Sequence, residues 1–170
     1  ELDRAIAGYR ALAESDPTHP KASAARFFAG FLQYEAGRFT EAARAWDADA
    51  GRLGGFEGAA RWYRAWARYL AGDPAAAEAL MALADPDGDR AGRRAAYWAI
   101  QVLSKRAPAA AAALAVRLVA RAPLGWYALL LRRQHPGVFP APAPPPPSPA
   151  VRPDPPAIRR ARALRAAQSW

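Results

Sequence analysis

The chain has 170 residues, a formal net charge of +9 and no cysteine. The lack of cysteine excludes a disulfide framework, a thiol nucleophile and a Cys-ligated zinc or iron–sulfur centre. The only histidines are His19 and His135, which argues against a multi-histidine metal site. A metal site built from these residue types is therefore not expected. Alanine supplies 47 of the residues, so the composition favours helices, and the length is that of one ordinary domain.

The charge is distributed unevenly along the chain. Residues 1–90 carry a net charge of −3, whereas residues 91–135 carry eight basic groups and no acidic one. A positive surface of this kind attracts polyanions, although a solvated helix face rich in arginine gives the same pattern. The negative first half argues against nucleic acid as the partner.

No membrane-spanning helix is expected from the sequence. The longest uncharged helical run, 107–116, is ten residues long, about half of the roughly 20 that a span needs. The chain starts at Glu1 with charged residues and has no apolar signal core. This start favours the interpretation that the sequence is a mature or excised piece.

The apolar spacing and the positions of glycine and proline predict helices throughout the chain. No run of alternating apolar and polar residues suggests a strand, so the fold class expected is all-α. The predicted helices are 2–14, 21–36, 40–49, 57–71, 74–84, 89–105, 108–121, 125–134 and 157–168.

A repeat of 35 residues organises these helices. The segments 25–46, 60–81 and 95–116 align without gaps at this offset. Gly37 and Gly72 coincide in the alignment, and the third segment has Ala107 there. Each segment opens with an aromatic pair and closes with a large apolar residue: Phe27–Phe28 and Trp46, Trp62–Tyr63 and Met81, and Tyr97–Trp98 and Val116.

Each segment is expected to form a helix hairpin. Gly37 and Gly72 would end the first helices, while Thr40 and Asp73 are the expected N-caps of the second helices. One hairpin cannot bury its aromatic side chains alone, but stacked hairpins can. Residues 1–138 are therefore predicted to form a right-handed superhelix of stacked antiparallel helix pairs, a tetratricopeptide-like solenoid. A Pro-rich connector, 139–156, and the start of a further helix, 157–170, are expected to follow. The expected helix has no closing signal, which favours the interpretation that the chain is truncated.

Motifs that carry chemistry are scarce. The glycine-rich stretch 51–55 lacks the Lys and Ser/Thr of a phosphate-binding loop. The acidic stretch 85–89 resembles the start of a calcium loop, but Ala96 stands where the bidentate Glu is required. A turn followed by a helix N-cap is the preferred interpretation. The aromatic side chains could stack on sugar rings or bases, yet their helical spacing favours a role in the core.

Two stretches resemble the superhelical domain of soluble lytic murein transglycosylases. They are 93–98, Arg-Arg-Ala-Ala-Tyr-Trp, and 122–130, Ala-Pro-Leu-Gly-Trp-Tyr-Ala-Leu-Leu. The similarity extends over 57–135. The segment 158–164 resembles the next segment of the family. Ala107 and Trp126 depart from the family's Gly and Tyr. The family's catalytic domain carries a Glu-Ser dipeptide followed by a Gly-Leu-Met-Gln motif. In this sequence Glu14-Ser15 is the only Glu-Ser dipeptide, and no Gly-Leu-Met-Gln motif follows it. Glu14 is therefore not assigned as a general acid, and no catalytic residue is expected.

The resemblance implies a noncatalytic scaffold portion of a periplasmic enzyme that cleaves peptidoglycan without a cofactor. This portion would brace a downstream catalytic domain and contact glycan strands of the murein. Peptidoglycan carries carboxylates, and the candidate ligand-binding residues are Arg93, Arg94, Arg117, Arg121, Trp126 and Tyr127. The alternative is a tetratricopeptide-like adaptor that binds a protein or peptide partner. The sequence beyond Trp170 would separate these two hypotheses.

Overall fold

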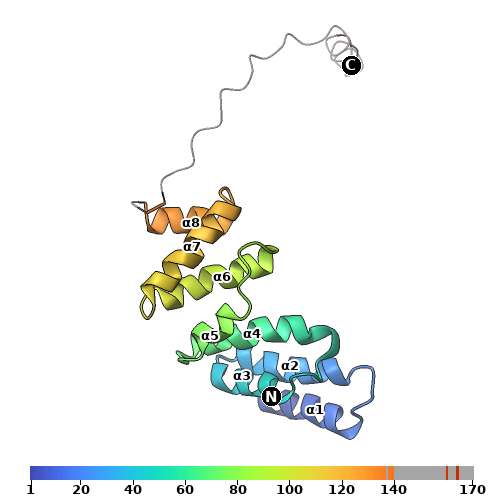
Figure 1. Ribbon diagram of the computed structural model, residues 1–170. Helices are drawn as coiled ribbons and strands as arrows, with labels where there is room; N and C mark the ends of the chain where they lie inside the picture. Colours follow the sequence, from blue (N-terminus) through green and yellow to red (C-terminus); the bar gives the residue numbers. More distant parts are fainter. Residues whose placement is uncertain (137, 140–159, 161–163, 165–170) are drawn as a thin grey trace. The chain divides into compact units, whose positions relative to one another are not determined.

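The computed structural model describes residues 1–136, 138–139, 160 and 164 (Figure 1). Within these residues the secondary structure is helical and contains no strand, which confirms the all-α prediction. The chain divides into a compact unit, Glu1–Pro140, and a second unit, Ala141–Trp170. The predicted connector 139–156 and the predicted helix 157–168 lie outside the described residues, apart from Phe139, Arg160 and Leu164.

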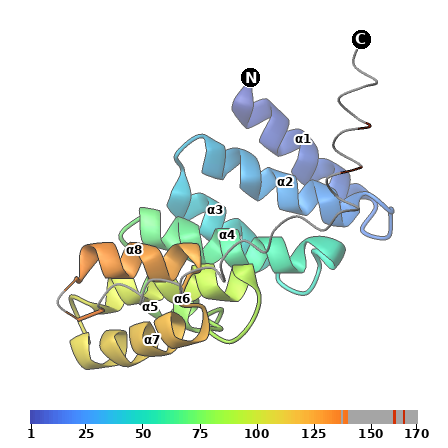
Figure 2. The same cartoon turned by 90° about the horizontal axis from the view of Figure 1, so that it is seen from above.

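The helices of the first unit follow the predicted ranges closely. Consecutive helices pack against one another in chain order from α1 to α8, and α8 also contacts α6 (Figures 1 and 2). The helices are α1 (Leu2–Ser15), α2 (Ala22–Glu35), α3 (Phe39–Ala48), the short 3₁₀ helix η1 (Gly54–Phe56), α4 (Glu57–Leu70), α5 (Ala76–Met81), α6 (Arg90–Leu103), α7 (Pro108–Arg121) and α8 (Trp126–Gln134).

The sequence repeat corresponds to three helix pairs. α2 and α3, α4 and α5, and α6 and α7 are the first and second helices of the three units. α2 and α4 begin at Ala22 and Glu57 and end at Glu35 and Leu70, so both bounds shift by 35 residues. The offset found in the sequence is therefore the spacing of the first helices of the first two hairpins, whereas α6 begins and ends 33 residues after α4.

Glycine ends the first helix of the first two pairs. Gly37 has φ +74° and Gly72 has φ +70°, a conformation that costs a side-chain-bearing residue energy. Arg38 N–H donates to the Gln33 carbonyl at 2.9 Å, and Asp73 N–H donates to the Arg68 carbonyl at 2.9 Å. These bonds reach back five residues, as in the Schellman ending of a helix. The predicted role of the two glycines is confirmed.

The third pair ends its first helix differently. Ala107 stands where the other units have glycine and adopts φ −145°. α6 stops at Leu103, and the Ala107 N–H donates to the Leu103 carbonyl at 2.7 Å. Pro108 then occupies the first turn of α7, where its missing N–H costs no helical hydrogen bond.

Three local expectations are wrong. Thr40 is not the N-cap of α3, because the helix begins one residue earlier at Phe39, directly after the turn at Gly37. α5 is shorter than the predicted 74–84. Asp73 is not its N-cap, because the Asp73 carboxylate accepts a hydrogen bond from the Ala75 N–H at 2.8 Å in a turn, and Ala75 is the residue that precedes the helix. At its end, Leu83 and Ala84 donate to carbonyls only three residues back, which tightens the chain before Asp85.

The core consists of two clusters of buried side chains. The N-terminal cluster is Phe27, Ala42, Ala43, Trp46, Leu53, Ala60 and Ala67. The C-terminal cluster is Ala65, Leu80, Ala96, Tyr97, Ala99, Ile100, Ala111, Leu114, Ala115, Leu118, Val119, Ala128, Leu131 and Phe139. α4 contributes to both, since Ala60 and Ala67 lie on one side of the helix and Ala65 on the other.

The large apolar residues that close the three repeats have different environments. Trp46 is buried, and its indole N–H donates to the Phe27 carbonyl at 3.2 Å. Met81 and Val116 are exposed, and the buried side chains on their helices are Leu80 and Leu118 among others. A Cβ built on Gly30 would lie 2.7 Å from the Trp46 indole, so glycine is what admits this large ring between α2 and α3.

The helix ending at Gly37 yields a stability prediction. Gly37→Ala should lower the free energy of unfolding by about 1 kcal/mol, because an L side chain is strained at positive φ. Gly58→Ala is the matched control. Gly58 lies within α4 with open space around it, so alanine there should raise stability by about 0.5–1 kcal/mol. Urea denaturation followed by circular dichroism measures both; equal effects of the two substitutions would contradict the assigned ending.

Candidate functional site

An aromatic surface lies on α4 and α6. Trp62, Trp66 and Tyr69 follow one another at spacings of four and three residues, which places them on one stripe of α4. The ring centroids of Trp62 and Trp66 are 5.7 Å apart, and those of Trp66 and Tyr69 are 4.9 Å apart, with the planes stacked in both pairs. Trp98 of α6 meets Trp66 edge-on at 4.5 Å. These four rings are called the ring surface below.

The ring surface is only partly covered by protein. All four side chains are half-buried, and Trp62, Tyr69 and Trp98 pack against the C-terminal cluster. Trp66 contacts each of the other three rings. Ala59 and Leu70 lie on the same stripe of α4 as Trp66, and both are exposed. The stripe therefore joins the core on one side and meets solvent on the other.

Arg94 completes this surface. Its guanidinium carbon lies 3.6 Å from the centroid of a Trp62 ring, within the range of a cation–π interaction. The Arg94 Nε is buried and has no hydrogen-bond partner within the described residues. A half-buried guanidinium held over an indole presents a planar donor group beside the stacked rings. This pairing could not be read from the sequence, because Trp62 and Arg94 belong to different repeats.

The other three predicted arginines lie elsewhere. Arg117 donates to the Asp87 carboxylate at 2.7 Å, and Arg121 approaches the same carboxylate at 3.8 Å. Arg93 donates to the Gly88 carbonyl at 2.6 Å. These three side chains converge on the loop before α6, whereas Arg94 points to the ring surface. The four arginines thus divide between two places.

The two predicted aromatic contacts also differ. Trp126 is 70% exposed at the start of α8. Tyr127 is half-buried, with its ring centroid 5.3 Å from that of Tyr97. The Tyr97 hydroxyl accepts a hydrogen bond from Gln134 Nε2 at 3.0 Å. Tyr127 is therefore a packing residue between α6 and α8, and Trp126 is presented to solvent away from the buried core.

The acidic stretch 85–89 forms a turn and a helix cap. Asp85 accepts a hydrogen bond from the Asp87 N–H at 3.1 Å, and Asp89 accepts one from the Gly92 N–H at 2.9 Å. Asp89 is the N-cap of α6, which confirms the preferred interpretation of this stretch. In the part of the chain that the structure describes, no group of three or more His, Cys, Asp or Glu side chains could hold a metal ion.

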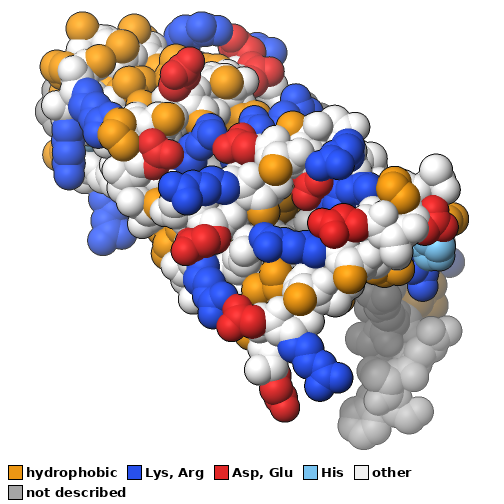
Figure 3. All heavy atoms as spheres, turned by 90° about the horizontal axis from the view of Figure 1, so that it is seen from below, with side chains coloured by type: hydrophobic (Ala, Val, Ile, Leu, Met, Phe, Trp, Pro, Cys, Tyr) orange, Lys and Arg blue, Asp and Glu red, His pale blue; other side chains and the backbone are white. Residues whose placement is uncertain are grey.

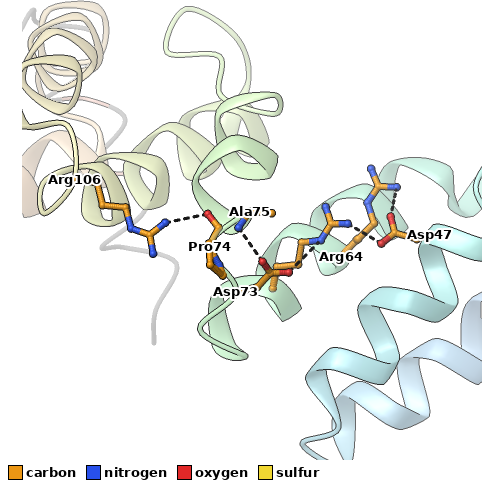
Figure 4. A network of polar contacts seen from close by, with 7 residues as sticks. Asp47, Arg64, Asp73, Pro74, Ala75 and Arg106 are labelled. Carbon is orange, nitrogen blue, oxygen red and sulfur yellow. Dashed lines mark hydrogen bonds and ion pairs between the residues drawn. The ribbon is translucent and has the colours of Figure 1, made fainter.

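A network of polar contacts connects the repeats. Asp47 of α3 accepts from Arg64 at 3.1 Å and from Arg68 at 2.7 Å, and Arg68 lies 3.8 Å from Asp73 (Figure 4). Arg106, in the turn between α6 and α7, donates to the Pro74 carbonyl at 3.0 Å. Basic and acidic side chains also neighbour each other in the space-filling view (Figure 3). We infer that these polar contacts help to hold the helix pairs together.

No protein-family model, curated protein or solved structure matches the chain. None of the described helices is long and apolar enough to cross a bilayer.

Alanine substitutions at two tryptophans distinguish a core residue from a residue of the ring surface by their cost in stability. Trp46→Ala should lower the free energy of unfolding by about 3–5 kcal/mol, because it empties a buried site. Trp66→Ala should cost no more than about 2 kcal/mol, because the half-buried ring loses mainly contacts with other rings. Urea denaturation measures both values. A cost for Trp66→Ala equal to that for Trp46→Ala would make Trp66 a core residue.

Proposed function

We propose that this chain is the noncatalytic scaffold portion of a periplasmic peptidoglycan lytic transglycosylase. It contacts glycan strands of the murein through the ring surface and Arg94, and it braces a catalytic domain elsewhere in the protein. The helix pairs stack as a right-handed, tetratricopeptide-like superhelix in this proposal. The observation that carries it is the stacked, half-exposed set of Trp62, Trp66, Tyr69 and Trp98 with a guanidinium beside it.

The chemistry of this surface suits a sugar polymer that bears carboxylates. The apolar face of a pyranose ring packs on an aromatic ring, and indoles offer a large apolar area with little conformational entropy to lose. A carboxylate of the murein pairs with a planar guanidinium by charge-assisted hydrogen bonds. Arg94 lies over one face of Trp62, which places its guanidinium beside the stacked rings and next to any sugar unit that packs on them.

The packing of the helices supports a bracing role. Ala42, Ala67 and Ala99 are fully buried, so neighbouring helices approach closely along the unit. The contacts of Asp47 with Arg64 and Arg68 add a polar tie between α3 and α4. In this proposal the joined stack of helices holds another domain in position.

Sedimentation with purified peptidoglycan sacculi tests the proposal. We expect the unaltered chain to sediment with sacculi. Trp66→Ala and Arg94→Gln should each weaken this binding about tenfold, which corresponds to about 1.4 kcal/mol. The matched controls are Trp126→Ala, an exposed indole away from the ring surface, and Arg117→Gln, an arginine paired with Asp87.

The controls decide which surface binds. Unchanged binding by both control variants, with the loss confined to Trp66 and Arg94, is the expected result. Failure of the unaltered chain to sediment would contradict the murein proposal and favour an adaptor that binds a protein or peptide. Equal loss in Arg117→Gln and Arg94→Gln would show that binding depends on net charge rather than on the ring surface.

A further inference from the structure

Two polar hollows lie along α1 and α2, beside the residues that flank α3. One hollow of about 480 Å³ lies at one end, lined by Arg10, Glu14, Ser23, Arg26, Asp49 and Arg52 among others. A second hollow of about 510 Å³ continues it toward Asp3 and Arg38. Both hollows share Arg10 and Glu14 of α1, so they adjoin one another and are together called the groove below. The ring surface does not contribute to this groove.

Two buried polar side chains line the groove from α2. Arg26 is 8% exposed and Gln33 is 7% exposed. With its amide oriented to suit both neighbours, Gln33 accepts from Arg10 Nη2 at 3.0 Å and donates to the Glu41 carbonyl at 3.1 Å. Gln33 is thus satisfied by the protein itself. Arg26 differs because it carries a full positive charge, which a neutral hydrogen-bond acceptor does not neutralise.

The charge of Arg26 is balanced only in part. Its Nη2 donates to the Ala13 carbonyl at 2.9 Å, which supplies a dipole but no charge. Its Nε lies 3.7 Å from Asp49 Oδ1, beyond ordinary hydrogen-bond length. The same oxygen accepts from Arg52 Nη2 at 2.7 Å. One carboxylate therefore serves two guanidiniums, and a buried positive charge without a full counter-ion is costly.

We propose that the hollow beside Arg26 binds the oxyanion group, a carboxylate or a phosphate, of a small ligand. Arg26 and Arg52 flank the site, and Arg10 lines it from α1. Guanidinium groups bind both oxyanions through paired N–H donors. The three arginines exceed Glu14 and Asp49 by one charge, so an anion entering the hollow neutralises the lining. The Ser23 hydroxyl lines the same hollow and offers a further donor.

The second repeat provides a natural comparison. Arg61 occupies the position 35 residues after Arg26, but its side chain is exposed. The third repeat has Ala96 at this position. Burial of the arginine is therefore confined to the first repeat, and Arg61 serves as the matched control.

Isothermal titration calorimetry of the whole chain tests the site, with inorganic phosphate in one arm and succinate in the other at matched ionic strength. We expect saturable binding of at least one anion. Arg52→Gln and Arg10→Gln should each weaken it about tenfold or more, since a hydrogen bond to a charged group is lost. Arg61→Gln should leave the affinity unchanged. These variants are at exposed positions, so the test does not depend on altering the buried Arg26.

The pattern of results decides the proposal. Binding of phosphate alone or succinate alone supports it and identifies the ligand group. No saturable binding of either anion would overturn it. Equal weakening by Arg61→Gln and Arg52→Gln would also overturn it, because the effect would then follow net charge and not this hollow.

Discussion

The two-sided packing of α4 is the constraint on which the described unit depends. Ala60 and Ala67, seven residues apart, bury one face of the helix in the N-terminal cluster, and Ala65 buries another face in the C-terminal cluster. A helix with small residues on two faces lets its neighbours approach on both sides. The clusters therefore share one helix. Large side chains at these alanine positions would separate the hairpins that the repeat brings together.

The remaining faces of α4 carry the groups that bear on function. Trp66 is half-buried within the ring surface and Leu70 is exposed, while Arg64 and Arg68 meet Asp47 of α3. One helix thus packs two cores, presents the ring surface and anchors a polar tie. The groove at Arg26 is separate, because it is built by α1, α2 and the turn that follows α3. This division explains how a chain rich in alanine displays two distinct surfaces.

Local sequence signals predicted most helix bounds, but they did not predict which residues distant in the sequence contact one another. Gly37 and Gly72 predict helix ends because the positive φ at these positions favours glycine. Arg93 and Arg94 look like one site in sequence, yet consecutive helical residues are about 100° apart and these two diverge. The basic run 91–135 lacks acids, but Asp87 folds back onto Arg117 from outside it. The partial neutralisation of Arg26 depends on a carboxylate 23 residues away, which no spacing reveals.

Pulse-labelling hydrogen exchange across a urea series tests the coupling through α4 most directly. If α4 joins the two clusters into one cooperative unit, amides of α2 and α3 and amides of α6 and α7 should lose protection at the same urea concentration. Mass spectrometry of peptides from the two regions measures both midpoints in one experiment. Two separate midpoints would show that the hairpins unfold independently and would contradict the account.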